Sequence, residues 1–291
     1  MLLALTALFW GGNFVMGRGV AGHVPPISLA FLRWSIATLI ILPFAWPHLR
    51  RELAVVRQHW PILFFLAATG GGSFNTLTYI GLNHTTALNA LVLNSAAPVL
   101  IALACYLLFR DRVSGLQGVG IVISLAGVLT VISKGALDVL LSLKPNAGDL
   151  WVLGAMLIWA VYTAFLRQRP RVHWLVFAFV LYFLSAAVNL PFFVGELIAG
   201  AELHLTWTTV LAVGYVSVFP SVLAYLFYNR GVELIGGTRA GVFMHLIPLF
   251  GAIFAIGFLG ETLAPYHGVG FALIVVGVTL AARSPSATRT S

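Results

Sequence analysis

The stretch GLNHTTALNALVLNSAAPVLIALACYLLFRDRVSGLQGVGIVISLAGV, residues 81–128, returns in altered form as GVELIGGTRAGVFMHLIPLFGAIFAIGFLGETLAPYHGVGFALIVVGV, residues 231–278. The two copies align without a gap at an offset of 231 − 81 = 150 positions. Pro248 thus corresponds to Pro98, and Glu261 corresponds to Asp111. A repeat of this length predicts that the chain is built from two similar units.

The composition predicts a membrane protein. Hydrophobic residues make up 60% of the 291 residues, charged residues make up 8%, and the mean hydropathy is +1.00. A water-soluble domain carries about 25% charged residues. Apolar runs of about 20 residues recur along the chain, and each could cross a bilayer core of about 30 Å as a helix. The runs lack the alternation of a β-barrel. We therefore predict an all-α, polytopic protein in a lipid bilayer.

Ten apolar segments predict ten transmembrane helices. The expected spans are 2–21, 27–46, 61–80, 87–109, 116–134, 149–166, 173–194, 207–228, 238–259 and 266–282. The opening MLLALTALFWGGNF lacks the basic start and the cleavage site of a signal peptide, so we interpret it as the first span. We expect a first five-helix unit at 1–134, a second at 149–282, and a disordered cytoplasmic tail at 283–291.

The basic residues predict how the chain is oriented. Lys134, Lys144 and Arg18 lie on one side of the predicted topology. The other side carries Arg50, Arg51, Arg57, Arg110, Arg112, Arg167, Arg169, Arg171, Arg230, Arg239, Arg283 and Arg289. Because cytoplasmic loops are enriched in Lys and Arg, we place both termini in the cytoplasm. The net charge of +8 therefore belongs to short loops, which argues against nucleic-acid binding.

An odd number of spans in each unit has a consequence for the architecture. Two similar units of five spans each must be inserted in opposite orientations. Inverted repeats of this kind are typical of transporters, whose substrate sites lie near mid-membrane where the halves meet. Cys105 is the only cysteine, so no internal disulfide can form.

These features resemble the drug/metabolite transporter superfamily, EamA type. The resemblance is carried by FLR at 31–33, by Pro98 and Pro248, and by the G-V-G…GV endings of the two copies. The opening ALTALFWGGNFVMGRGV and the aromatic-rich spans are most similar to the bacterial aromatic amino acid exporters. The resemblance implies a cofactor-free carrier of the bacterial inner membrane that exports aromatic amino acids by alternating access, with amphipathic aromatic drugs as a further substrate class. We expect a monomer.

Polar and aromatic residues at mid-membrane depth predict a central substrate pocket. Pro98 and Pro248 each free the carbonyl four residues earlier, which is tolerated only against protein or a water-filled cavity. Trp and Tyr offer flat faces with one donor each, and Asn offers both a donor and an acceptor. The predicted pocket residues are Trp10, Asn13, Asn75, Tyr79, Asn94, Trp159, Tyr162, Tyr225 and His245.

Structural alternatives exist for several of these residues. Asn75 and Asn94 suit interhelical hydrogen bonds equally well, and His245 could be a satisfied core histidine. Residues 70–72, Gly-Gly-Gly, indicate close packing or a flexible point, because no Lys-Ser/Thr follows as in a phosphate loop. Arg33 is expected about 9 Å from the outer end of its span. We favour structural pairing or outward snorkelling for it over contact with a substrate carboxylate.

The driving force and the substrate stay open at this point. No Asp or Glu lies in the interior of a predicted span, since Asp149 is the first residue of its span, so we predict either facilitated diffusion or weak proton coupling through His245. The alternative substrate is another small metabolite, such as a non-aromatic amino acid or a nucleobase. A membrane enzyme is disfavoured because HExxH, G-x-S-x-G and paired carboxylates at depth are missing. A purely structural membrane protein is disfavoured by polar residues in at least five spans.

Overall fold

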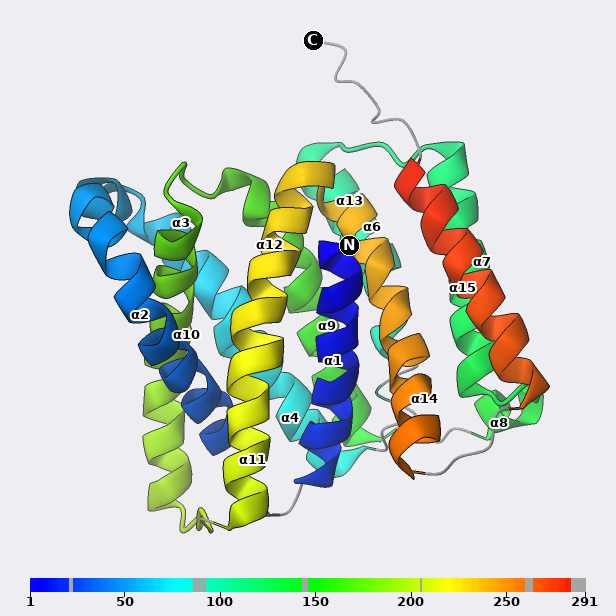
Figure 1. Cartoon of the computed structure of the whole chain (residues 1–291), viewed down its shortest axis with the longest axis horizontal. Coiled ribbons are helices and arrows are strands. Elements are labelled where there is room, and N and C mark those ends of the chain that lie inside the picture. The colour runs from blue at the N-terminus through cyan, green and yellow to red at the C-terminus, as the bar shows by residue number, and fades with distance from the viewer. Residues whose placement is uncertain are drawn as a thin grey trace.

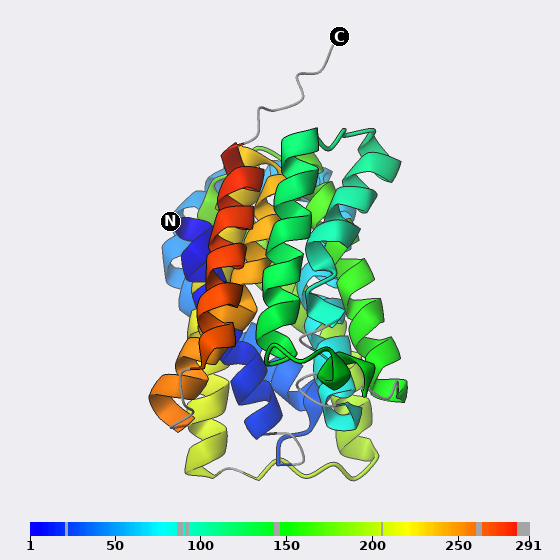
Figure 2. The same cartoon turned by 90° about the vertical axis from the view of Figure 1, so that its right-hand side faces the viewer.

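The computed structural model describes residues 1–20, 23–85, 90, 93–142, 146–204, 206–259 and 264–283. These residues form a bundle of helices, with no strand among them (Figures 1 and 2). Within them, six helices are long and apolar enough to cross a membrane, and two shorter apolar helices lie at Leu2–Asn13 and Ala97–Phe109. The all-α prediction is thereby confirmed for the described residues, and the long apolar helices are consistent with a polytopic membrane protein. The predicted tail lies outside the described residues except for Arg283.

We group the helices by the two units predicted from the sequence, residues 1–134 and 149–282. The first unit contains α1 (Leu2–Gly19), α2 (Pro26–Gln58), α3 (Trp60–Ala67), η1 (Ala68–Ser73), α4 (Phe74–His84), α6 (Ala97–Phe109) and α7 (Gly115–Ile132), with the short α8 (Leu137–Leu141) in the link. The second contains α9 (Ala147–Phe165), η2 (Leu166–Gln168), α10 (Trp174–Ile198), α11 (Trp207–Val216), η3 (Ser217–Leu223), α12 (Ala224–Ile235), α13 (Gly237–Val242), η4 (Phe243–His245), α14 (Leu246–Leu259) and α15 (Pro265–Arg283).

Both α1 and α15 reach the same end of the bundle. Figure 1 shows α1 starting at the upper end and α15 finishing there, and we use "upper end" and "lower end" in that sense. The links from α2 to α3, α6 to α7, α9 to α10 and α12 to α13 also lie at the upper end. The chain segments at these links carry most of the arginines.

Three helix boundaries differ from the predicted spans. Helix α2 continues to Gln58 instead of ending at 46, through Pro43 and Pro47, because its basic last turns can extend beyond the apolar core. The ninth span is interrupted by the 3-10 turn η4 shortly before Pro248. In the fourth span, α6 begins only at Ala97, immediately before Pro98. Both interruptions lie just before a proline, Pro98 or Pro248, which has no backbone N–H to donate to the preceding helical turn.

Helices from the two units pair side by side in opposite directions. Between α2 and α10, the ring of Phe31 stacks on Phe193 at 4.5 Å and His48 stacks on His173 at 3.7 Å. The Phe31–Phe193 pair joins the start of α2 to the end of α10, and the His48–His173 pair joins the later part of α2 to the start of α10. The two helices are therefore antiparallel. This pairing brings Trp34 of α2 within 5.4 Å of the Tyr182 ring, near the centre of the molecule.

Glycines bring α7 and α15 into backbone contact, also antiparallel. A Cβ added at Gly277 would lie 2.4 Å from the Ser124 nitrogen and 2.6 Å from the Gly120 oxygen. A Cβ at Gly127 would lie 2.7 Å from the Gly270 oxygen. The repeated glycines of the two copies therefore allow close helix packing, because any side chain there would separate the backbones.

Two π-helical segments, η1 and η3, occupy equivalent positions in the two units. Segment η1 contains the Gly-Gly-Gly run, where a Cβ at Gly70 would lie 2.4 Å from the Tyr162 ring. Segment η3 contains Pro220, whose carbonyl accepts from Trp10 Nε1 at 3.1 Å. The glycine run thus provides close packing, which was one of the two predicted alternatives for it. Both π segments turn carbonyl groups toward central aromatic side chains, and π-bulges of this kind often occur at functional sites.

The lower end is held by a carboxylate that caps a helix of the other unit. Helix α2 has no side-chain cap of its own. Instead, Glu196 near the end of α10 accepts from the Ile27 nitrogen at 3.1 Å, and from the Ser28 nitrogen and hydroxyl at 2.6 and 2.7 Å. A carboxylate at a helix N-terminus satisfies free N–H groups and interacts favourably with the helix dipole.

Replacing Glu196 with alanine should therefore destabilise the protein. We expect a loss of about 1–2 kcal/mol in the free energy of unfolding, in the range measured for removal of an N-cap. Thermal unfolding of the detergent-solubilised protein measures it. Glu202→Ala is the matched control, because the side chain of Glu202 is 78% exposed and, within the described part of the chain, its one ion pair is with His204 at 3.5 Å. Equal stability of the two variants would contradict the capping role.

Candidate functional site

Five aromatic rings meet between the two units near the centre of the bundle. We call them the ring cluster: Trp10 of α1, Trp159 and Tyr162 of α9, and Tyr225 and Tyr228 of α12. The Trp10 and Trp159 rings meet edge to face at 5.2 Å and 87°. Trp10 lies 5.1 Å from Tyr228, and Trp159 lies 5.0 Å from both Tyr162 and Tyr228. Centroid separations this short are those of rings in direct contact.

A second group surrounds the guanidinium of Arg33, on α2. We call it the arginine cluster: Arg33, Asn13, Asn75, Tyr79 and Ser221. Nε of Arg33 donates to the Ser221 hydroxyl at 2.7 Å. Nη1 donates to Asn75 Oδ1 at 2.8 Å, to the Tyr79 hydroxyl at 2.5 Å and to Asn13 Oδ1 at 3.4 Å. The side chain is 0% exposed, so the expectation that it snorkels outward is wrong.

Tyr225 joins the two clusters. Its hydroxyl accepts from Asn75 Nδ2 at 3.0 Å and donates to the Gly70 carbonyl at 2.6 Å. Its ring packs edge to face against Trp34 at 4.9 Å, and the Arg33 guanidinium carbon lies 5.1 Å from the centre of that same Trp34 ring. Aromatic surface and a cation thus adjoin each other with hydrogen-bonding groups between them.

Two predicted pocket residues lie apart from these clusters. His245 Nε2 contacts the Ser95 carbonyl at 2.9 Å, and its Nδ1 contacts the Ser124 hydroxyl at 2.7 Å. Both amide atoms of Asn94 are buried, and no group in the described part of the chain hydrogen-bonds to either of them. Among the described residues, no hydrogen bond or ring contact joins His245 or Asn94 to the ring cluster.

The contacts of His245 predict a structural role in place of proton coupling. A neutral imidazole that donates from Nε2 to Ser95 and accepts at Nδ1 from Ser124 satisfies both ring nitrogens. We therefore expect His245→Asn to leave the pH dependence of transport unchanged in proteoliposomes with an imposed pH gradient. Ser124→Ala, which removes only the hydroxyl partner, is the companion variant. A pH response that disappears in His245→Asn would instead make His245 the coupling residue.

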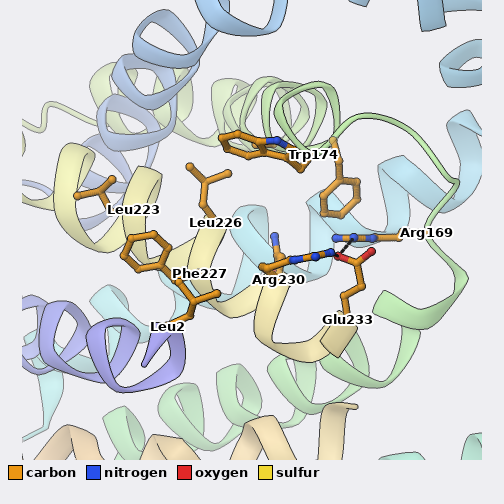
Figure 3. A pocket seen from close by; sticks show the side chains of 11 residues that line it. Leu2, Arg169, Trp174, Leu223, Leu226, Phe227, Arg230 and Glu233 are labelled. Atoms are coloured by element: carbon orange, nitrogen blue, oxygen red, sulfur yellow. Dashed lines mark hydrogen bonds and ion pairs between the residues drawn. The ribbon is translucent and has the colours of Figure 1, made fainter. Parts of the chain in front are cut away.

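Two cavities open at the upper end, above the ring cluster. One, of about 560 Å³, lies between α1, α10 and α12, and its wall includes Leu2, Trp174 and Phe227 (Figure 3). The other, of about 790 Å³, lies beside the α9–α10 link and the turn from α12 to α13. Both are lined by Arg169, Asn229 and Glu233.

Charged groups and one amide connect these cavities to the interior. Arg169 and Arg230 both pair with Glu233 at 2.7 Å, and Figure 3 shows the two cations on either side of that carboxylate. Asn229 lies deeper in the protein than these charged groups. It is only 5% exposed, and its Oδ1 accepts a hydrogen bond from the Tyr162 hydroxyl at 2.7 Å. A polar route therefore leads from the upper cavities to the ring cluster.

The structure brings seven of the nine predicted residues together in two joined clusters. Their arrangement differs from the expected chamber, because the described rings of the cluster contact one another directly, with the nearest centroids 5.0–5.2 Å apart. The prediction omitted Arg33, Trp34, Ser221 and Tyr228 from the pocket. Ser221 and Tyr228 share the polar side of the eighth span with Tyr225, and that spacing was the signal available for them.

Comparisons with known proteins agree with this architecture. The profile of the EamA-like transporter family matches residues 1–133 and 146–283. An uncharacterized transporter of Archaeoglobus fulgidus is 31% identical over 287 residues, which covers 96% of each chain. The uncharacterized transporter YyaM of Bacillus subtilis is 26% identical over 289 residues, or 97% of this chain and 92% of that one.

Two further comparisons concern a described relative and a solved structure. A probable amino-acid metabolite efflux pump of Salmonella typhimurium is 26% identical over 293 residues, or 95% of this chain and 92% of that one. A protein crystal structure, 20% identical, matches with a TM-score of 0.76 over 96% of this chain and 95% of its own, and so shares the fold. The family match covers nearly all of both units, and the chain therefore belongs to the EamA-like transporter family of membrane transporters.

Proposed function

We propose that this transporter exports aromatic amino acids from the cytoplasm by alternating access at the ring cluster. The observation that carries the proposal is the ring cluster itself, buried between the units and bordered by the hydrogen-bonding groups of the arginine cluster. Aromatic faces suit a flat side chain, and amide and hydroxyl groups suit the ends of an amino acid. The Salmonella relative is described as a probable amino-acid metabolite efflux pump, which supports export of an amino-acid-like substrate.

We further propose that ten spans form two inverted five-helix repeats that move against each other. Residues at equivalent positions meet at the unit boundary: Asn75 bonds Tyr225, and the Ser95 carbonyl contacts His245. Each of these pairs is 150 positions apart. A twofold axis in the membrane plane brings equivalent residues together in this way, and it also requires equivalent helices to be antiparallel, as α7 and α15 are.

In this proposal the upper end faces the cytoplasm. The links there carry the arginines, as the enrichment of cytoplasmic loops in basic residues favours. Substrate enters through the upper cavities and reaches the ring cluster past Asn229. At the lower end, Glu196 ties α10 to α2, and Asp149 accepts from the Thr85 hydroxyl to tie α9 to the end of α4. These contacts between the units must separate before substrate leaves on the outer side.

A flux panel in proteoliposomes tests the substrate class. The purified protein is assayed for uptake of labelled phenylalanine, threonine and uracil, with empty liposomes as the blank. We expect phenylalanine to be carried and to be competed by tryptophan and tyrosine but not by threonine. Preferential transport of threonine or uracil would replace the aromatic assignment with the alternative of another small metabolite.

A further inference from the structure

Arg33 is a buried cation without an acidic partner. The described residues form four ion pairs, and these engage Arg167, Arg169, Arg230 and His204, not Arg33. All of the groups that accept from Arg33 are neutral amides or hydroxyls. An uncompensated charge in a low-dielectric interior is costly, so a buried cation is normally paired with an anion.

One nitrogen of the guanidinium also lacks a hydrogen-bond partner among the described residues. This nitrogen, Nη2, is buried, whereas Nε and Nη1 are both engaged. A guanidinium binds carboxylates best through two parallel N–H groups. The neighbours of Arg33 hold its guanidinium in place without using Nη2. Trp34 and Tyr79, at 5.1 and 5.8 Å from the guanidinium carbon, stabilise the cation in part.

The guanidinium of Arg33 lies close to the surface proposed for the substrate ring. Asn75 contacts Arg33 with its oxygen and Tyr225 with its nitrogen, so a single amide separates the cation from the ring cluster. Trp34 contacts both the guanidinium and the Tyr225 ring. An amino acid whose side chain replaces ring contacts in the cluster would therefore have its backbone carboxylate beside Arg33.

We propose that Arg33 binds the carboxylate of the transported substrate. This inference rests on the proposed function in assuming a central site, and it assigns the chemical class of that substrate as a carboxylic acid. Arg33 supplies the unused Nη2 donor, and the substrate supplies the missing counter-charge. Without substrate, the guanidinium is held by neutral hydrogen-bond acceptors alone. Purely structural pairing, the role favoured on the sequence alone, leaves the unused Nη2 and the lack of an acid unexplained.

The test compares each acid with its amide on the whole protein in proteoliposomes. Uptake of labelled phenylalanine is competed with phenylalanine, phenylalaninamide, leucine and leucinamide, because the amide keeps the side chain and amine but removes the negative charge. In the wild-type protein we expect the acid to compete at least about tenfold more strongly than its amide, the scale of a hydrogen bond to a charged group. In Arg33→Gln that ratio should approach one, and Arg33→Lys should recover part of it.

Arg57→Gln is the matched control, since Arg57 lies exposed in the last turn of the same helix and should keep the wild-type ratio. Equal competition by acid and amide in the wild-type protein overturns the proposal, whether or not the Arg33 variants fold. If leucine is carried in place of phenylalanine with the acid preferred, Arg33 keeps its role and only the aromatic assignment fails. Transport of uracil without any acid overturns both.

Discussion

Replacing Gly277 with alanine is expected to cost about 1–3 kcal/mol of stability, and replacing it with valine is expected to prevent folding. The new Cβ would lie 2.4 Å from the Ser124 nitrogen and 2.6 Å from the Gly120 oxygen. Both are backbone atoms, which cannot rotate away, so α7 and α15 would have to separate along their contact. Overpacking of a rigid core typically costs about this much for each added methyl group.

The matched control for this prediction lies on the same helix. A Cβ added at Gly268 would meet nothing within 4 Å. Gly268→Ala should therefore be neutral or slightly stabilising, because alanine favours the helix over glycine by up to about 1 kcal/mol. Thermal unfolding and the monodisperse yield in detergent measure both variants. Opposite signs for the two alanines are expected, and equal effects would contradict close packing as the function of the repeated glycine.

The sequence could predict this packing because both helices repeat the same glycine spacing. Gly120 and Gly127 recur as Gly270 and Gly277, and the structure pairs them crosswise between the units. Such a pattern is local in each copy, and small residues at helical spacing are typical of close contacts in membranes. The six long apolar helices could be predicted for the same reason, since length and hydropathy are properties of a single segment.

Arg33 shows what could not be predicted from one segment. Distance along the helix places it near the outer end of its span, where snorkelling is the normal expectation. The structure buries it because Ser221 of η3 and Asn75 of α4 pack across that part of α2. When Ala30-Phe31 is aligned with Ala178-Phe179, the counterpart of Arg33 in the second unit is Leu181, which is apolar, so the repeat gave no indication of a charged site. Which distant segments pack over a residue depends on the tertiary structure, and the residue pattern of a single helix does not show it.

The closed centre was unpredictable for a related reason. Spacing along the first span places Trp10 and Asn13 on one face, and the structure confirms that both face the interior. Facing inward does not determine how far the opposing rings are apart. That distance depends on how the two units are arranged, and in this arrangement the rings are in contact.

Replacing Trp10 with alanine is expected to reduce transport of an aromatic substrate roughly thirtyfold. Trp10 contacts Trp159, Tyr225 and Tyr228 and donates to the Pro220 carbonyl. A central aromatic residue at a binding site typically contributes about 2 kcal/mol or more, which corresponds to that factor. The ratio of transport efficiencies for phenylalanine and leucine is the decisive measurement, because loss of ring contacts should affect the aromatic substrate more.

Two companion variants separate binding from folding in this experiment. Trp207→Ala is the control, since Trp207 is 77% exposed on α11 and away from the ring cluster. Trp10→Phe keeps a ring and most of the packing but removes the N–H that holds the η3 carbonyl. It should keep the preference for phenylalanine over leucine even if its rate falls. If Trp10→Ala and Trp10→Phe lower both substrates equally, Trp10 acts through helix packing and the substrate ring binds elsewhere.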